Sequence, residues 1–142
     1  MKKISTFIIL SAVFVLCTSM SGCEDSSYRV FKVTIENESD DSIYYVINNW
    51  LEHSPLSPQV CFEEIPILGE RMRSLAAGEK DEDFKVQDNG VNDFLGILIF
   101  KKSTMNKYTK KELVEKNIYD KQYTLFYEDL KKMDFRIIYT GE

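Results

Sequence analysis

The feature that most constrains the fold is an uninterrupted apolar run, Phe94 to Phe100 (FLGILIF), in the second half of the 142-residue chain. An apolar run of this length is typical of a strand whose two faces are both buried. We therefore expect residues 94–100 to form a central strand. A second run, Ile43 to Ile47 (IYYVI), is rich in β-forming residues and predicts another strand.

Shorter strands are expected around these two runs. Residues 30–36 alternate apolar and polar side chains, as a half-buried strand does. The turn cluster at 37–42 (NESDDS) leads directly into the strand at 43–47, so the sequence predicts a β-hairpin over residues 29–48. Further strands are predicted within residues 66–75, around Phe84 and Val86, at 122–127 and at 135–139.

Two small helical pieces complete the expected secondary structure. Thr109 and Glu112 have the spacing of a capping box, which predicts a helix over residues 110–117, and residues 128–132 are expected to form a helical turn. About seven short strands with one or two short helices predict a mainly-β fold, namely an immunoglobulin-like antiparallel β-sandwich.

The first 22 residues have the three-part layout of a secretory signal. Lys2 and Lys3 form a positive start, Phe7 to Leu16 is apolar, and small or polar residues follow up to Cys23. The apolar run is about half of the ~20 residues that a membrane-spanning helix requires. We therefore expect an exported protein rather than one held by a permanent transmembrane helix.

Residues 20–23 (MSGC) resemble the lipobox of bacterial lipoproteins, with Met20 in place of the usual Leu. The resemblance implies that the Cys23 thiol is alkylated by a diacylglyceryl group and that cleavage makes Cys23 the first residue. Cys17 is the rival site, but Leu16 before it is too large. The alternatives are ordinary secretion with a free Cys23 and an uncleaved anchor. The expected organisation is a signal peptide at 1–22, a tether at 23–27 and one β-sandwich domain at 28–142.

Composition excludes some partners of the processed chain. Removing 22 of the 142 residues leaves 120, and it takes away two lysines and no acids, so the net charge changes from −5 to −7. This acidity argues against nucleic-acid binding and against adhesion to anionic lipid head groups. Once Cys17 is removed and Cys23 carries lipid, Cys61 has no partner, so we expect it to be a small buried hydrophobic residue.

The last third of the chain, residues 99–141, resembles the end of small uncharacterised lipoproteins from gut Bacteroidota. The similarity lies in a capped helix, a Tyr-Thr-Leu strand, an Asp-Leu turn and an aromatic-rich last strand, and residues 43–48 also fit. Glu24 and Asp25 further resemble the acidic surface-export signal of such lipoproteins. These resemblances imply a lipid-anchored protein of the cell envelope, at the periplasmic or surface face of the outer membrane. They transfer no catalytic residue.

The residues give little support to catalysis or metal binding. His53 is the only histidine, and no nucleophile motif lies beside it or Cys61. The acidic segment 81–93 is rich in oxygen ligands but does not match the spacing of a calcium loop. We expect no enzyme activity, no bound metal and no cofactor.

Binding and modification are the remaining candidates. Tyr44, Tyr45 and Trp50 are close in sequence, and the long irregular stretch at 48–66 also contains His53, so these four residues are the predicted binding site for a glycan or a protein. Residues 41–43 (DSI) resemble the acceptor of Bacteroidota O-glycosylation, with Ser42 as the modified residue. The competing interpretation is that these residues hydrogen-bond the local backbone, as turn residues do.

The sequence therefore favours a non-catalytic, lipid-anchored binding module whose partners are the membrane, through its lipid, and a glycan or an envelope protein. The alternative is a structural or envelope-assembly lipoprotein that acts through a protein–protein interface, such as an open edge strand. A small hydrolase is a third and minor alternative.

Overall fold

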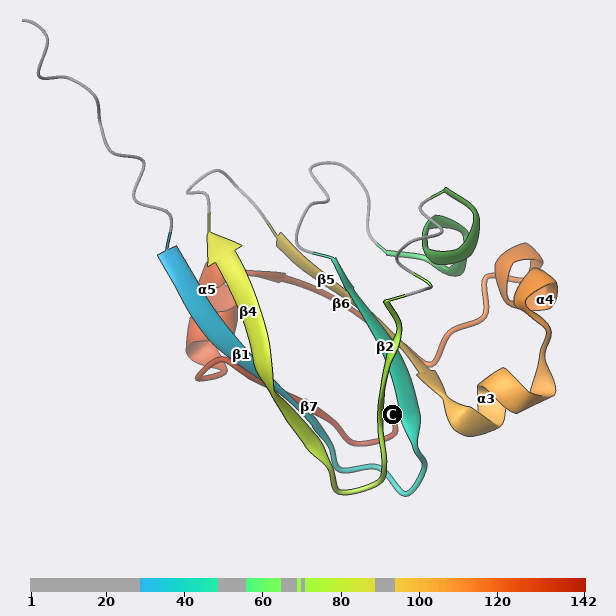
Figure 1. The fold of residues 1–142 in the computed structure, drawn as a ribbon, viewed down its shortest axis with the longest axis horizontal. Helices are drawn as coiled ribbons and strands as arrows, with labels where there is room; N and C mark the ends of the chain where they lie inside the picture. The colour runs from blue at the N-terminus through green and yellow to red at the C-terminus, as the bar shows by residue number, and fades with distance from the viewer. Residues whose placement is uncertain (1–28, 49–55, 65–68, 70, 89–93) are drawn as a thin grey trace, which may run out of the picture.

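The computed structural model describes residues 29–48, 56–64, 69, 71–88 and 94–142, and these residues form two β-sheets that face each other (Figure 1). One sheet has three strands in the order β4-β1-β7, and the other has four in the order β3-β2-β5-β6. The predicted mainly-β sandwich of seven strands is therefore confirmed. The strands are β1 (Arg29–Asn37), β2 (Ile43–Asn48), β3 (Arg73–Leu75), β4 (Lys80–Asp88), β5 (Phe94–Lys101), β6 (Lys121–Phe126) and β7 (Arg136–Tyr139).

Strand pairing departs from the sequence-based expectation in two respects. All pairs are antiparallel except β1–β7, which is parallel, so the prediction of a wholly antiparallel sandwich is wrong for this pair. The predicted hairpin over residues 29–48 is also wrong, because β1 and β2 lie in different sheets. The strand order differs from that of constant-type immunoglobulin domains, in which the first, second, fifth and fourth strands share one sheet.

The crossover between β1 and β2 is organised by the side chain of Asn37, which is buried. Its Nδ2 donates hydrogen bonds to the carbonyl oxygens of Asp41 (2.8 Å) and Ala76 (3.0 Å), and its Oδ1 accepts one from Ser39 Oγ (2.6 Å). The backbone N–H of Gly78 donates to the Asn37 carbonyl at 2.7 Å. Asn37 thus links the crossover to the turn between β3 and β4, where the chain also passes from one sheet to the other.

Strand β5 has both faces buried, as its apolar run predicts. Ile97 and Ile99 belong to the core between the two sheets, whereas Leu98 and Phe100 belong to a second apolar cluster on the outer face of the four-stranded sheet. Residues outside the sheet complete the second cluster, among them Leu56, Val60, Cys61 and Leu113.

Short helices lie outside the sheets. The π-helix η1 (Val60–Glu64) and the helix α4 (Lys110–Glu115) bury residues in the second cluster, whereas α5 (Tyr127–Lys132) contributes Leu130 to the inter-sheet core. In Figure 1, α3 (Lys102–Lys107) and α4 lie at the end of the sandwich opposite α5. None of the helices in the described part of the chain is sufficiently long and apolar to cross a membrane.

Helices α3 and α4 differ in how far local sequence determines them. The predicted capping box of α4 is confirmed: Thr109 Oγ1 accepts from the Glu112 N–H (3.2 Å), and Glu112 Oε2 accepts from the Thr109 N–H (2.9 Å). Helix α3 was not predicted, and the side chain of its N-cap residue, Lys101, makes no capping hydrogen bond. Instead, Asp120 accepts hydrogen bonds from the Lys101 N–H (2.7 Å) and from Thr104 Oγ1 (3.0 Å), which brace α3 from a distant part of the chain.

Candidate functional site

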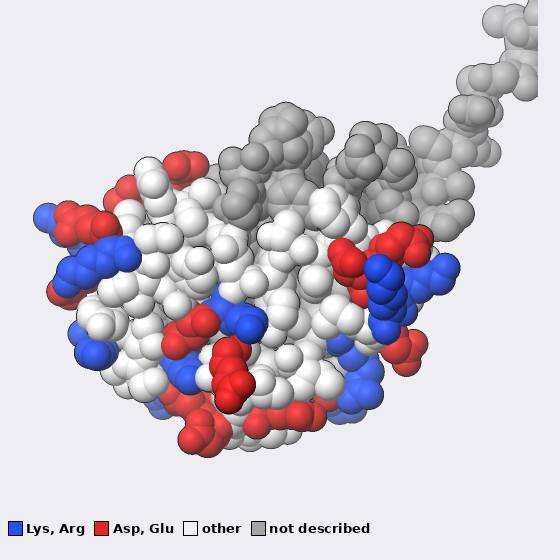
Figure 2. Space-filling view, turned by 180° about the vertical axis from the view of Figure 1, so that it is seen from behind, with Lys and Arg blue, Asp and Glu red and all other residues white. Residues whose placement is uncertain are grey.

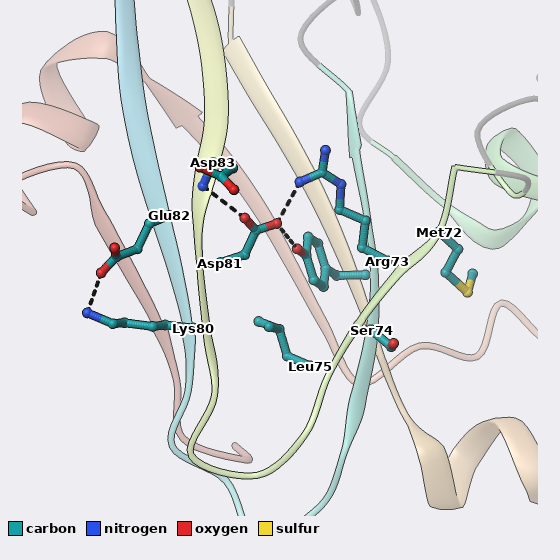
Figure 3. Close-up of a pocket in the computed structure, with 9 residues that line it drawn as sticks. Met72, Arg73, Ser74, Leu75, Lys80, Asp81, Glu82 and Asp83 are labelled. Atoms are coloured by element: carbon teal, nitrogen blue, oxygen red, sulfur yellow. Dashed lines mark hydrogen bonds and ion pairs between the residues drawn. The ribbon is translucent and has the colours of Figure 1, made fainter.

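A groove opens between β3 and β4, which are edge strands of opposite sheets (Figure 3). Its volume is about 650 Å³, with residues 72–75 on one wall, residues 80–83 on the other, and Tyr45 of β2 between them. A second hollow of about 180 Å³ shares Tyr45 and Arg73 with the groove and is also lined by Ile47, Arg71 and Phe84. The two hollows are therefore neighbouring parts of one surface, which we call the β3–β4 groove.

The Asp81 carboxylate links the two walls of the groove. Its Oδ2 accepts a hydrogen bond from the Tyr45 hydroxyl (2.5 Å) and lies 2.6 Å from Arg73 Nη1, while its Oδ1 accepts from the Asp83 N–H (3.0 Å). Figure 3 shows the Arg73 and Asp81 side chains pointing toward each other across the opening. Asp81 is only 15% exposed at its side chain, whereas Arg73 is 50% exposed. The ion pair therefore joins the edges of the two sheets while leaving part of the guanidinium accessible.

The protonation states of this trio are fixed at neutral pH. Burial acts to raise the pKa of Asp81, but hydrogen bonds from Tyr45, the Asp83 backbone and Arg73 outweigh it and hold the pKa below its ordinary value. Burial, and then the hydrogen bond to Asp81, raises the pKa of Tyr45. The hydrogen bond to Asp81 also raises the pKa of Arg73. None of the three groups titrates near neutral pH, so the arrangement is suited to binding and bracing rather than to proton transfer.

The groove also contains planar hydrogen-bond donors beside an aromatic ring. Arg71 and Arg73 are two of the four arginines in the sequence. The guanidinium carbon of Arg73 lies 5.9 Å from the centre of the Phe84 ring. Arg71 is exposed and forms no ion pair with any residue that the structure describes. An accessible guanidinium near an aromatic face can bind a carboxylate through paired hydrogen bonds while an attached ring contacts the aromatic side chain.

The structure does not bring the predicted tyrosines together. Successive side chains of a strand point to opposite faces. Tyr45 lines the groove, but it is only 1% exposed, and its hydroxyl donates to Asp81. Tyr44 is half-buried on the other face, against the second apolar cluster. Trp50 and His53 lie outside the described residues, as do Cys23, the signal at 1–22 and the tether at 23–27.

The turn residues and the lone cysteine have structural roles. The Ser42 carbonyl accepts from the Lys102 N–H (2.8 Å), and Asp41 Oδ2 accepts from the Ser103 N–H (3.1 Å), so the turn holds the start of α3. O-glycosylation of Ser42, which is half-buried, stays a prediction. Cys61 is fully buried, as expected, and burial raises the pKa of its thiol to about 12.

Two acidic side chains at the start of the segment 81–93 form ion pairs. Asp81 binds Arg73, and Glu82 pairs with Lys80. No three metal-ligating side chains are gathered in the described ranges in a way that could hold an ion. The remaining candidate oxygen ligands at 89–93 lie outside those ranges.

Sequence reasoning missed Arg71, Arg73 and Phe84, and it considered Asp81 only as one of the oxygen ligands of the acidic segment. Two arginines two residues apart are visible in the sequence, the second of them at the start of a short strand, but nothing local indicates that the strand faces β4 of the other sheet. No protein-family model, no curated protein and no solved structure matches the chain. Its function is therefore argued from the β3–β4 groove.

Proposed function

We propose that this chain is a lipid-anchored protein of the cell envelope and that its sandwich is a non-catalytic module that binds an acidic glycan in the β3–β4 groove. The observation that carries the proposal is the accessible pair of guanidinium groups, Arg71 and Arg73, beside the Phe84 ring. Both arginines line the same hollow of about 180 Å³, which is the size of a small substituent rather than of a whole oligosaccharide.

Chemical complementarity points to a ligand that carries a carboxylate. A guanidinium presents parallel N–H donors that match the two oxygens of a carboxylate, and this geometry is stronger and more directional than contact with an ammonium group. Arg73 already forms an ion pair with Asp81 through Nη1 alone, so Arg71, which has no described ion-pair partner, is the side chain we assign to the ligand. Phe84, which is half-buried, provides an apolar face for the sugar ring.

The walls of the groove favour a hydrated ligand over an apolar protein anchor. Protein interfaces are usually dominated by aromatic or aliphatic side chains that fill dry pockets. Here the wider part of the groove is bordered by Lys80, Glu82 and Asp83, all of which are exposed. Sugar hydroxyls can exchange hydrogen bonds with such groups and with water, so a glycan fits this surface better.

The membrane anchor is part of the same proposal. It rests on the signal layout of residues 1–22 and on the lipobox-like residues that end at Cys23. Acyl chains contribute about 0.8 kcal/mol per buried methylene, so several chains on one cysteine would hold the domain durably at the outer membrane. A tether at 23–27 would extend under ~20 Å and keep the domain close to that membrane.

The test is a glycan array probed with the full chain extracted in detergent, in which each uronic-acid glycan is paired with its carboxyl-reduced form. We expect binding to acidic glycans only. Arg71→Ala should weaken it about 10- to 100-fold, because a hydrogen bond to a charged group contributes roughly 1.5–3 kcal/mol. Arg71→Lys should recover part of the loss, since it keeps the charge but not the paired donors.

Lys107→Ala is the matched control, because it removes one exposed cation on α3 and lines a different hollow. It should leave glycan binding unchanged. Equal binding of the acidic and carboxyl-reduced glycans, or equal losses with Arg71→Ala and Lys107→Ala, would show that the groove does not recognise a carboxylate.

A further inference from the structure

The four edge strands of the sandwich are protected to different extents. An unpaired strand edge can associate with another chain, and proteins usually prevent this with short strands, charges or bulges. Strands β3 and β7 have three and four residues. Strand β4 has nine, but it carries exposed Lys80, Glu82, Asp83 and Lys85, and its register with β1 shifts at a bulge.

Strand β6 has fewer of these protections, because Lys121 at its start is its only charged residue. It has six residues, its register with β5 is regular, and residues 122–126 (QYTLF) carry no charge. Tyrosine, threonine, leucine and phenylalanine are also residues that strands tolerate or favour. Among the strand edges that the structure describes, β6 is therefore the one most open to pairing.

The hydrogen bonding of β6 indicates which backbone groups face outward. The Lys102 N–H donates to the Ser42 carbonyl beside β2 (2.8 Å), so residues 96, 98 and 100 of β5 direct their backbone groups toward β2, and residues 95, 97 and 99 direct theirs toward their β6 partners 125, 123 and 121. The Phe126 N–H donates to Asp129 Oδ2 (3.2 Å). In an antiparallel pair, residues alternate between those that bond the neighbouring strand and those that face away from it. The backbone N–H and C=O of Thr124, and of Gln122 before it, therefore lie on the outer edge. The Thr124 side chain is exposed and does not cover them.

The β6 strand carries few charges. Figure 2 shows the molecule from the side opposite to Figure 1, where β6 and β7 lie; uncharged side chains cover much of this face, and charged side chains of both signs lie near its middle and at its margins. Exposed apolar side chains nearby include Phe126 (47% exposed) and Ile138 of β7 (37% exposed). The Tyr123 hydroxyl donates to the Ile138 carbonyl at 3.4 Å, which links the two edge strands.

We propose that two copies of this chain pair through the outer edges of β6, in antiparallel orientation about a two-fold axis, into one continuous sheet. Such an interface is self-complementary, because each copy supplies the same strand. A register centred on Thr124 pairs the outward-facing residues 122, 124 and 126 with one another across the two-fold axis. It places Lys121 of one copy opposite Tyr127 of the other, next to Glu128. Lys121 lies over its own Tyr123 ring (6.0 Å), and neither Lys121 nor Glu128 has an ion-pair partner among the described residues.

Charge distribution favours a second copy that approaches from this side. The processed chain has a net charge of −7, since the signal takes two lysines from a chain of net charge −5, so copies repel one another over most orientations. Strand β6 itself contains no acid, and the pairing adds one Lys121–Glu128 contact per copy. This inference is independent of glycan binding, because the β3–β4 groove is on the opposite edges of the sheets.

The experiment is sedimentation velocity of the full chain in detergent over a range of protein concentrations, together with disulfide trapping. We expect a concentration-dependent dimer. Thr124→Lys should weaken it at least tenfold, because a charge on the outer edge opposes strand pairing. Ser74→Lys, on the exposed edge strand β3, is the matched control and should leave the dimer unchanged.

Trapping distinguishes a second copy from another partner. Thr124→Cys should form a covalent dimer under mild oxidation, and Ser74→Cys should not. A chain that stays monomeric at every concentration, or a dimer that Thr124→Lys leaves intact, would overturn the proposal. So would cross-linking of Thr124→Cys in whole cells to a different protein with no covalent dimer of this chain.

Discussion

Replacing Tyr45 with phenylalanine isolates one hydrogen bond in the network that joins the two sheets. The Tyr45 hydroxyl is the buried donor to Asp81 Oδ2 at 2.5 Å, and the ring itself is only 1% exposed. A hydrogen bond to a charged group contributes about 1.5–3 kcal/mol. Asp81 keeps its contacts with Arg73 and the Asp83 N–H, and Arg73 is half exposed to solvent, so we expect Tyr45→Phe to lower the free energy of unfolding by about 1–2 kcal/mol at pH 7.

The pH dependence of this loss follows from the lowered pKa of Asp81. A carboxyl whose pKa is depressed by folding stabilises the native state above its unfolded pKa, roughly 4, and loses that contribution as the pH falls through the folded value. When Asp81 is protonated, its bond with Tyr45 is an ordinary neutral one of about 0.5–1.5 kcal/mol. The cost of Tyr45→Phe should therefore shrink in acid.

Urea unfolding at pH 7 and pH 2 measures both effects. Tyr139→Phe is the control, because Tyr139 is equally buried but its hydroxyl has no hydrogen-bond partner among the described residues, so its removal should cost little or should stabilise. A double variant of Tyr45→Phe with Asp81→Asn should lose less than the sum of the single variants, since both remove the same contact. Additive losses, or a Tyr45→Phe cost that is the same at both pH values, would refute the reasoning.

Two other predictions concern the anchor and the second apolar cluster. Cys23→Ser should abolish incorporation of a fatty-acid probe in cells, and retained labelling would contradict lipidation at Cys23. Gly96→Ala should lower the free energy of unfolding by about 1–3 kcal/mol, because its new methyl group would lie 3.2 Å from Leu56 Cγ. Adding Leu56→Ala should relieve that clash. In urea unfolding, the double variant should therefore lose less stability than the sum of the two single losses.

The elements that the sequence predicts well are those determined by neighbouring residues. The run at 94–100 predicts a strand buried on both faces, and β5 is that strand, because no charged residue interrupts either face. The α4 capping box is confirmed because its two partners, Thr109 and Glu112, are three residues apart. In both cases the information that specifies the structure lies within one element.

The features that sequence reasoning missed depend on which sheet a strand joins. The alternation of residues 30–36 shows that one face of β1 is buried. It does not show whether β1 pairs with β2 in one sheet or packs against β2 from the other sheet, because both arrangements bury one face. Val33 of β1 and Ile43 of β2 meet in the inter-sheet core, so packing is the arrangement that the chain adopts. The β3–β4 groove was missed for the same reason, since Arg73 and Asp81 meet only because their strands belong to opposite sheets.

The opposite sides of the sandwich are closed by different means, and this relates the two proposals. On one side, a short turn carries the chain from β3 to β4 in the other sheet, and the Arg73–Asp81 ion pair spans the gap that results. On the other side, the Tyr123 hydroxyl spans from β6 to β7, and the β6 edge is left unpaired. A dimer formed at β6 would therefore leave both grooves open. Two grooves on one anchored assembly would bind a repeating acidic glycan more tightly than either alone, provided that the polymer can reach both sites.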